Sequence, residues 1–494
     1  MFETAIAQLR FGMSMALGTR FHVPSIDRIL AAMEETKREF GALGEDADEM
    51  LSGPVLDEAT RTEVQLRRFR RQARRAVDET DYYARMFGDS GLNPDALEAA
   101  DLASLPTTTK EALRTEPDAF VARSARPVLR ATTTGTTGRP ASVYFSEHEL
   151  AATASLTALG FANHDQVEPE DLVVVSMSPR AQLVVSGISR ACAKIGALAQ
   201  VVGILEPEHT LALLTEPRHL DGRRGRVSVL ATYPSHLGEL VEHGLACGLG
   251  PEDFGLRQIM TGGEMLTAGL RRRCHELFGE HVRVGQVYGI TELAPFGGNL
   301  CSQGHLHFEP SGGLVEVQAI GERRPADPGE LGTVVATPLP PYRETSILLR
   351  YDSEDVVRRL ERPPECELRA LPATSHLRGK LSMGVRHDGG WTFPREVAEA
   401  LEGLDHVPLP ARHGFWQLEG GVAVEVCARR DSAAARRAIG EALEAAGVPV
   451  RRLTLTDDAA QLERPRPLRC DLKQYVFDGR PSLRRAPAAA EEAS

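Results

Sequence analysis

The middle of the chain alternates short apolar runs with amphipathic segments. The apolar runs, which have the length and the Val, Ile and Leu content of buried strands, are residues 171–177, 199–205, 226–232, 256–260 and 282–289. Helical patterns separate them, over residues 186–197 and from about Pro234 and Thr267 onward. Strands that alternate with helices predict an α/β fold with a largely parallel sheet covered on both faces.

The pattern changes towards the C-terminus. Runs at 313–320, 332–339 and 344–353 have little helix between them and predict a small β subdomain. Beyond residue 378, the pattern predicts helices over 394–404 and 431–448, the second one capped by Asp431 or Ser432, and strands over 421–430 and 450–456. We therefore expect a small α+β domain at this end.

Four regions follow from these patterns. We predict an N-terminal helical region over 1–75, a large domain over 76–377 and a small domain over 378–485. The remaining tail, residues 486–494, is low in complexity and is predicted to be disordered.

Composition and charge narrow the class of protein. The 494 residues carry a net charge of -12, which argues against a nucleic-acid partner. Seven arginines crowd residues 61–75, but Leu66, Phe69, Ala73 and Val77 recur there at helical spacing, which indicates an amphipathic helix with a solvated basic face. No apolar run approaches the ~20 residues of a membrane span. We predict a cytoplasmic protein without a membrane partner.

Three polar stretches are candidates for chemistry. The stretch "RATTTGTTGRP", residues 130–140, combines glycines with threonine hydroxyls and is typical of a loop that binds phosphate, although no Lys follows Gly138 as it does in a P-loop. The stretch "VYGITELAPFGGN" places Tyr288, Thr291 and Glu292 after a predicted parallel strand, where α/β sheets bind ligands. In "RYDSEDVV", Asp355 follows a strand and can accept hydrogen bonds from a ribose diol.

Taken in order, "TTTGTTGRP", "YGITE", "GELG" and "RYDSED" resemble the core motifs of the adenylate-forming superfamily. More narrowly, the chain is similar to the phenylacetate-CoA ligase branch, on account of "DYYARMF", "ATYPSHLGEL", the "GGE" at 262–264 and "CSQGHLHFEPSGGLVEV". The resemblance covers roughly residues 80–485. It implies a small mobile C-terminal domain and an ATP-dependent ligase that converts an aryl or other compact acid into its acyl-AMP, releases pyrophosphate and passes the acyl group to CoA.

The resemblance also implies cofactors and site residues. ATP and Mg²⁺ are the implied cofactors, with Glu292 as the Mg²⁺ ligand, and Thr291, Glu292 and Lys473 as the catalytic residues. The implied ATP- and AMP-binding residues are Thr133, Thr134, Gly135, Thr136, Thr137, Gly138, Gly262, Gly263, Glu264, Tyr288, Gly289, Thr291, Asp355 and Lys380. The implied acid-binding residues are Ser178, Pro179, Thr232, Tyr233, Pro234, Gly289 and Ile290.

The C-terminal region departs from the family pattern. Lys380 stands where Arg is usual, and Ser382 or Met383 stands where an acidic hinge residue is expected. Alignment on "FDGR" places Leu472 at the position of the late catalytic lysine and Lys473 one residue beyond it. Two alternatives to the CoA ligase therefore stay open: transfer of the adenylate to an amine or another nitrogen acceptor, as in amide synthetases and nitrite-using diazotases, and a degenerate nucleotide-binding regulator. A homodimer is compatible with the sequence.

The cysteines have one further pattern. Their number, seven, is odd and they form no Cys-x2-Cys pair, which argues against a disulfide framework. Cys301, His305 and His307 can supply up to three zinc ligands, but no fourth ligand is evident, although Cys274 and His275 can approach in space. We favour a plain structural role for this stretch and predict no stoichiometric zinc.

Overall fold

The computed structural model describes residues 2–41, 57–133 and 140–462. By packing, the chain divides into two compact units. Unit 1 contains the chain up to Thr232 together with Glu252–Gly263 and His281–His376. Unit 2 contains Tyr233–Pro251, Glu264–Glu280 and the chain from Leu377 onward.

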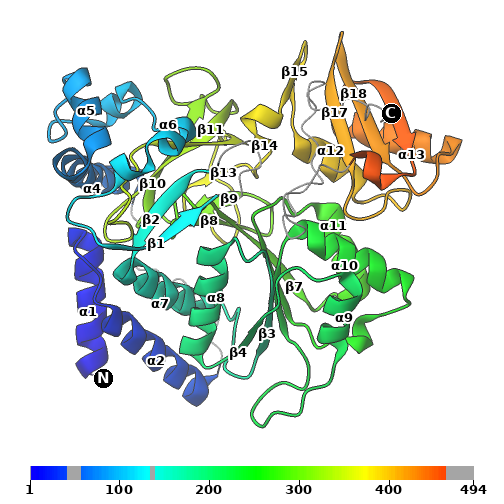
Figure 1. Ribbon diagram of the computed structural model, residues 1–494, viewed down its shortest axis with the longest axis horizontal. Helices are drawn as coiled ribbons and strands as arrows, with labels where there is room; N and C mark the ends of the chain where they lie inside the picture. The colour runs from blue at the N-terminus through cyan, green and yellow to red at the C-terminus, as the bar shows by residue number, and fades with distance from the viewer. Residues whose placement is uncertain (1, 42–56, 134–139, 463–494) are drawn as a thin grey trace, which may run out of the picture. The chain divides into compact units, whose positions relative to one another are not determined.

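The centre of unit 1 is an eight-stranded sheet of order β13-β9-β8-β7-β6-β5-β3-β4 (Figure 1). Its parallel strands are β3 (Leu172–Ser176), β4 (Leu198–Val201), β5 (Val229–Thr232), β6 (Gln258–Gly262) and β7 (Arg283–Gly289). Antiparallel strands β8 (Gly297–Leu300), β9 (Leu306–Phe308) and β13 (Ala373–Thr374) extend it. The predicted α/β class with a largely parallel sheet is confirmed.

Helices pack on this sheet because the apolar strands must be buried. Helix α8 (Gln182–Ile195) contacts β3 and β4, and α7 (Glu147–Asn163) packs against α8 and against α2 (Val23–Phe40). The other α-helices in the described part of unit 1 are α1 (Phe2–Leu17), α4 (Glu58–Glu79), α5 (Asp81–Ser90), α6 (Lys110–Thr115) and α9 (Pro207–Thr215). In the described residues, no helix is both long and apolar enough to cross a membrane.

The arginine-rich segment forms α4, as predicted, but its basic face is only partly solvated. Phe69 and Ala73 are fully buried, and Arg68 is buried with them and donates a hydrogen bond to the carbonyl of Pro340. Burial lowers the pKa of Arg68. A buried arginine was unexpected because the periodicity does not show that a distant carbonyl faces the helix.

The predicted β subdomain is present as antiparallel strands β10 (Gly313–Ala319), β11 (Leu331–Pro338) and β12 (Tyr351–Arg358). The prediction of a strand over 344–353 was wrong in position, since β12 begins only at Tyr351. Arg350 adopts φ 45°, a left-handed conformation that interrupts an extended strand. Its guanidinium is buried and forms a bidentate ion pair with Glu316, from Nε to Oε2 at 2.9 Å and from Nη2 to Oε1 at 3.0 Å. This ion pair holds the conformation of Arg350 in place.

A smaller hairpin, β1 (Pro127–Thr132) and β2 (Ser142–Ser146), flanks the threonine- and glycine-rich stretch. Its end is closed by Thr133, whose amide donates to the Ala141 carbonyl at 2.9 Å and whose hydroxyl accepts from the Ala141 amide at 3.0 Å. Residues 134–139 lie outside the described part of the chain.

Unit 2 joins helices α10 (Pro234–Ala246) and α11 (Ala268–Phe278) to the small α+β domain. That domain contains the β15–β16 ribbon (Val385–His387, Gly390–Thr392), helices α12 (Pro394–Leu401) and α13 (Ala433–Ala445), and the sheet of β17 (His413–Leu418), β18 (Gly421–Cys427) and β19 (Val450–Thr456). Its core includes Val397, Phe415, Val424 and Ile439. Ser432, one of the two predicted caps, is the N-cap of α13 and accepts from the Ala435 amide at 3.1 Å.

Within unit 1, one buried tyrosine ties the segment that carries α5 and α6 to the residues before β12. The Tyr83 hydroxyl lies 2.7 Å from Thr108 Oγ1 and accepts from the Leu349 amide at 2.7 Å. Burial raises the pKa of Tyr83 well above its ordinary value, so the hydroxyl stays protonated. This bond network sets where α6 lies relative to β12.

We expect Tyr83→Phe to lower the stability of the protein. The change leaves the buried Leu349 amide without its acceptor, which costs about 1–3 kcal/mol, whereas the Thr108 hydroxyl keeps its bond to the Leu349 carbonyl at 2.7 Å. The measurement is the temperature of the first thermal unfolding transition. Tyr82→Phe, on the same helix, is the matched control, because half-buried Tyr82 makes ring contacts with Phe120 instead. Equal transition temperatures for the two variants would contradict the assignment.

Candidate functional site

The parallel strands of unit 1 end in register, so the residues after them share one edge of the sheet. Ser176 of β3 pairs with Thr232 of β5, Thr232 pairs with Thr261 of β6, and Gly262 pairs with Val287 of β7. The carboxyl edge of a parallel sheet is where α/β folds bind ligands. The stretches predicted to bind the nucleotide and the acid therefore begin at neighbouring points.

Two tyrosine–carboxylate pairs join this edge to the β subdomain. The Tyr288 hydroxyl, at the end of β7, donates to Asp355 Oδ2 on β12 at 2.9 Å. In return, the Tyr351 hydroxyl, at the start of β12, donates to Glu292 Oε1, just after β7, at 2.8 Å. Each segment thus supplies one tyrosine and one carboxylate, and each carboxylate follows its own tyrosine by four residues.

The surroundings of these pairs are dry. Glu292 is 3% exposed and Asp355 is 8% exposed. Burial, followed by the charge of Asp355, raises the pKa of Tyr288 well above its ordinary value, and burial followed by the charge of Glu292 does the same for Tyr351. Both tyrosines therefore stay protonated and remain hydrogen-bond donors to the two carboxylates.

A lysine completes the surroundings of Glu292. Lys110 is the first residue of α6, and its Nζ lies 3.3 Å from Glu292 Oε1. Its side chain is 15% exposed, so the ion pair is largely removed from water. Thr108, two residues earlier, bonds with the backbone of Arg350 and Asp352 at 2.9 and 3.0 Å, which places α6 beside the start of β12.

Asp355 is aimed by an irregularity in β12. Asp352 pairs with Val335 and Val356 pairs with Thr333, so residues 353–355 lie opposite the single residue Val334. Within this bulge, Glu354 adopts φ 61°, and the Ser353 hydroxyl donates to the Val334 carbonyl at 2.7 Å while it accepts from the Asp355 amide at 3.1 Å. Bulges of this kind re-aim a side chain beside a functional site.

The remaining predicted residues divide between the two units. In unit 1, Gly262 ends β6 and Gly263 follows it with φ 77°. Ser178, after β3, and Thr232, at the end of β5, are buried. Ile290 and Thr291 are half-buried, and Pro179 and Gly289 are exposed. In unit 2, Tyr233 is the N-cap and Pro234 the first residue of α10, and Glu264 accepts a hydrogen bond from the Ser235 amide of that helix at 2.9 Å. Lys380 is half-buried in β14 (Gly379–Lys380). Thr134 to Gly138 and Lys473 lie outside the described residues.

Sequence reasoning missed Tyr351 and Lys110. Tyr351 lies within the quoted "RYDSED" stretch, and the shared spacing of tyrosine and carboxylate in "YGITE" and "YDSED" was a readable signal. Lys110 lies 182 residues before Glu292 in the chain, and only the packing of α6 against β12 brings the two together.

The site fits the Mg²⁺ that the resemblance implies. Mg²⁺ takes oxygen ligands and is commonly held by one or two carboxylates together with substrate phosphates. Glu292 supplies one buried carboxylate at the edge where such a substrate would bind. The one cluster of three or more potential metal ligands found in the described residues has cysteine and histidine as ligands and lies elsewhere in unit 1.

Comparison with known proteins identifies the family of the chain. The family of AMP-binding enzymes matches residues 71–336. The chain is 25% identical to phenylacetate-coenzyme A ligase of Thermus thermophilus over 62% of this chain and 68% of the relative. It is 23% identical to phenylacetate-coenzyme A ligase of Escherichia coli over 70% of this chain and 76% of the relative.

Solved structures show the same fold. A 2-hydroxyisobutyryl-CoA ligase in the postadenylation state, in complex with 2-HIB-AMP, superimposes with a TM-score of 0.67 at 19% identity, over 81% of this chain and 87% of the other. The anthranilate CoA ligase AuaEII in complex with anthranoyl-AMP gives a TM-score of 0.52 at 13% identity, over 70% of this chain and 65% of the other. On the family match and the shared motifs, the chain belongs to the AMP-binding enzymes, as an ATP-dependent, AMP-forming ligase in the phenylacetate-CoA ligase-like branch of the adenylate-forming superfamily.

Proposed function

We propose that this protein activates an aryl or otherwise compact carboxylic acid as its acyl-AMP and transfers the acyl group to CoA. The observation that carries the proposal is the pair of buried carboxylates, Glu292 and Asp355, each held by a tyrosine at the carboxyl edge of the sheet. The relatives named for phenylacetate point to an aryl acid, and those named for 2-hydroxyisobutyrate and anthranilate point to compact ones.

In the proposed first step, a carboxylate oxygen of the acid attacks the α-phosphorus of ATP. The new O–P bond forms as the bond to the β-phosphate oxygen breaks, and pyrophosphate leaves with the electron pair. Such a step depends on positioning and on charge neutralisation more than on a protein nucleophile. Asp355 would bind the ribose hydroxyls, Thr291 would contact the α-phosphate, and the stretch from Thr133 would surround the β- and γ-phosphates.

Glu292 would act on the phosphate charge. When bound by Glu292 and the phosphates, Mg²⁺ would neutralise charge on the departing pyrophosphate. Tyr351 and Lys110 would fix the orientation of the Glu292 carboxylate, since both contact its Oε1. Lys110 is thus a positioning residue in this proposal. We set aside the alternative of a degenerate regulator, because both carboxylates of the site keep their hydrogen-bond donors.

A nitrogen acceptor is the second candidate, and the β15–β16 ribbon of unit 2 favours it. Trp391 stacks on Phe393 with ring centroids 5.7 Å apart and pairs across the ribbon with exposed Arg386. The resemblance implies that this strand guides the pantetheine arm of CoA, and large side chains here would narrow or reshape such a channel. The residues that precede the ribbon, Leu381–Met383, form a short 3-10 turn without the acidic hinge residue of the family.

Glu292→Gln should reduce adenylation by about 100- to 1,000-fold, the usual cost of removing one group that stabilises transition-state charge. ATP–pyrophosphate exchange with mixed aryl acids measures this, and circular dichroism reports whether the fold is intact. Glu354→Gln is the matched control, because it makes the same chemical change on the neighbouring bulge and should leave exchange near normal. Near-normal exchange in folded Glu292→Gln would remove Glu292 from the mechanism.

Asp355→Ala should raise the KM for ATP by roughly 10- to 100-fold, since a charge-assisted contact is worth about 1.5–3 kcal/mol. Asp355→Asn keeps an oxygen acceptor for the Tyr288 hydroxyl but loses the charge, so it separates ribose binding from the positioning of Tyr288. We expect its KM to lie between those of wild type and Asp355→Ala. An unchanged KM in Asp355→Ala would show that the ribose binds elsewhere.

The acceptor can be decided by mass spectrometry of reactions that contain ATP, the acid and either CoA, an amine or nitrite. Some acids should support rapid ATP–pyrophosphate exchange. For these acids we expect the CoA thioester to form slowly or not at all, because of the altered hinge and ribbon, and the nitrogen nucleophile to complete the reaction. Rapid, stoichiometric thioester formation with every such acid would restore the plain CoA ligase and exclude the nitrogen acceptor.

A further inference from the structure

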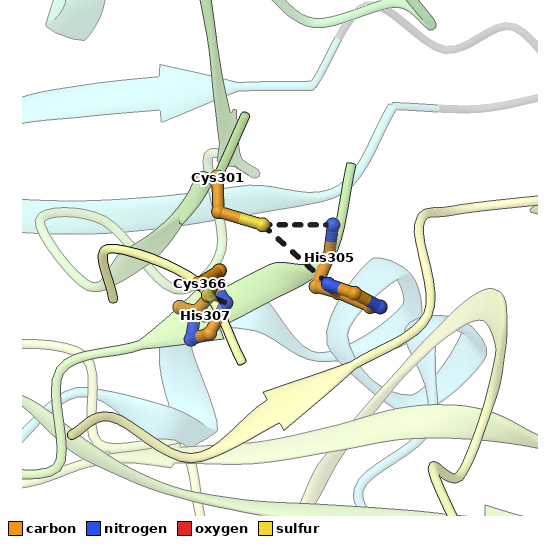
Figure 2. A group of neighbouring side chains, drawn as sticks. All are labelled: Cys301, His305, His307 and Cys366. Atoms are coloured by element: carbon orange, nitrogen blue, oxygen red, sulfur yellow. Dashed lines mark hydrogen bonds between the residues drawn. The ribbon is translucent and has the colours of Figure 1, made fainter. Parts of the chain in front are cut away.

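A second group of reactive side chains lies in unit 1, apart from the tyrosine–carboxylate pairs. Cys301, His305, His307 and Cys366 place one ligand atom each within 4.8 Å of all the others (Figure 2). The first three were recognised in the sequence as up to three zinc ligands, and the missing fourth was the objection to that reading. Cys366 supplies it, whereas the alternatives Cys274 and His275 lie on α11 in unit 2.

We propose that Cys301, His305, His307 and Cys366 bind a structural zinc ion. Two cysteines and two histidines are one of the ligand sets of closed, tetrahedral zinc sites, in which the protein fills all four positions. The proposal concerns stability and stands apart from the proposed function, because it names none of the residues assigned to ATP or the acid.

The distances agree with a tetrahedral centre. With Zn–S bonds of about 2.3 Å and Zn–N bonds of about 2.0–2.1 Å, a sulfur and a nitrogen ligand lie about 3.5 Å apart. The Cys301 Sγ atom is 3.5 Å from His305 Nδ1, and the Cys366 Sγ atom is 3.3 Å from His307 Nε2. The two cysteine–histidine pairs therefore already have the separation that a shared zinc ion requires.

The second layer of contacts orients the ligands. His307 Nδ1 lies 3.3 Å from the Leu371 carbonyl, and donation of its N–H there leaves Nε2 with a lone pair directed at the cluster. Cys301 Sγ accepts from the backbone amide of His305 at 3.2 Å. A carbonyl behind the histidine and an amide on the sulfur are the supports that metal ligands use.

The loop that carries Cys366 has no buried apolar side chain that packs it against the rest of unit 1. Residues 359–372 connect β12 to β13 without a helix or strand, and none of them is buried. Their path is instead tied to the turn after β8: the Glu367 carboxylate accepts from the Ser302 hydroxyl at 2.8 Å, and Gln303 donates to the Glu365 carbonyl at 2.6 Å. A long loop with no buried side chain is normally functional or held by some other constraint, and a metal ion is such a constraint.

The cluster is accessible to an ion. Cys301 and His307 are buried, whereas His305 and Cys366 are half-buried. His305 also lines an open hollow of about 600 Å³ together with residues of the 358–365 segment. A metal site needs such a route by which the ion enters.

The ion would cross-link two segments that lead away from the tyrosine–carboxylate pairs. Cys301, His305 and His307 belong to the β8–β9 hairpin, which follows Glu292, and Cys366 belongs to the loop after β12, the strand that carries Asp355. The paired strands β9 and β13 continue this connection, with His307 opposite Ala373. Loss of the ion should therefore loosen the frame on which both carboxylates stand without removing any group assigned to the reaction.

The test is elemental analysis of the full-length protein, expressed with zinc and purified without chelators. We expect about one zinc per chain, as in a closed four-ligand site, and X-ray absorption with two sulfur ligands at about 2.3 Å and two nitrogen ligands at about 2.0–2.1 Å. Cys366→Ser and Cys301→Ser should each lose most of the zinc. Cys247→Ser is the matched control, because Cys247 is an exposed thiol in unit 2 and should retain the full content.

A measurement on the wild type keeps the proposal falsifiable if a cysteine variant does not fold. Removal of zinc by a chelator should lower the thermal unfolding transition and make the 359–372 loop sensitive to protease, and added zinc should reverse both. Folded wild-type protein that contains no zinc and binds none on titration would overturn the proposal, as would one zinc per chain retained in folded Cys366→Ser. Neither result would bear on the ATP–pyrophosphate exchange that tests the proposed function.

Discussion

The cost of placing two carboxylates in a dry site is the constraint on which the rest of unit 1 depends. A buried charge without hydrogen-bond partners is strongly unfavourable. The structure meets this cost with donors from opposite elements: Tyr288 of β7 donates to Asp355 on β12, and Tyr351 of β12 donates to Glu292 after β7. Because each tyrosine donor comes from the other segment, these two hydrogen bonds form only when the main sheet and the β subdomain are both folded and in contact.

Several features outside the site follow from this exchange. Asp355 reaches Tyr288 only because the β12 bulge turns it, and the bulge requires Glu354 at φ 61° and the two hydrogen bonds of Ser353. Lys110 reaches Glu292 only because Tyr83 and Thr108 bind α6 to the chain around β12. The left-handed backbone of Glu354 and the long-range hydrogen bonds of Tyr83 and Thr108 thus have the same result: they fix two carboxyl groups from separate elements at one edge of a sheet.

How far the sequence could predict this structure depends on the distance over which each interaction acts. Apolar runs such as 226–232 and caps such as Ser432 are local signals, and they predicted the parallel strands, the start of α10 at Pro234 and the cap of α13. The start of β12 was misplaced because the backbone of Arg350 is set by Glu316, 34 residues away. Tyr351, Lys110 and Cys366 were missed because each meets its partner 59 or more residues away in the chain, and only the folded topology brings them together.

The same constraint decides at which positions a substitution lowers the stability of the protein strongly and at which it does not. An apolar substitution at Tyr288, Tyr351, Glu292 or Asp355 removes one partner of a buried hydrogen bond, which is among the more destabilising changes a protein can undergo. Of the residues predicted to meet the acid, four are also buried, namely Ser178, Thr232, Tyr233 and Pro234. The other three are placed differently, since Pro179 and Gly289 are exposed and Ile290 is half-buried, at or just beyond the ends of β3 and β7. Substitutions there disturb little of the core. The frame that we propose for the nucleotide can therefore carry pockets for different acids, since a shared fold does not fix the substrate.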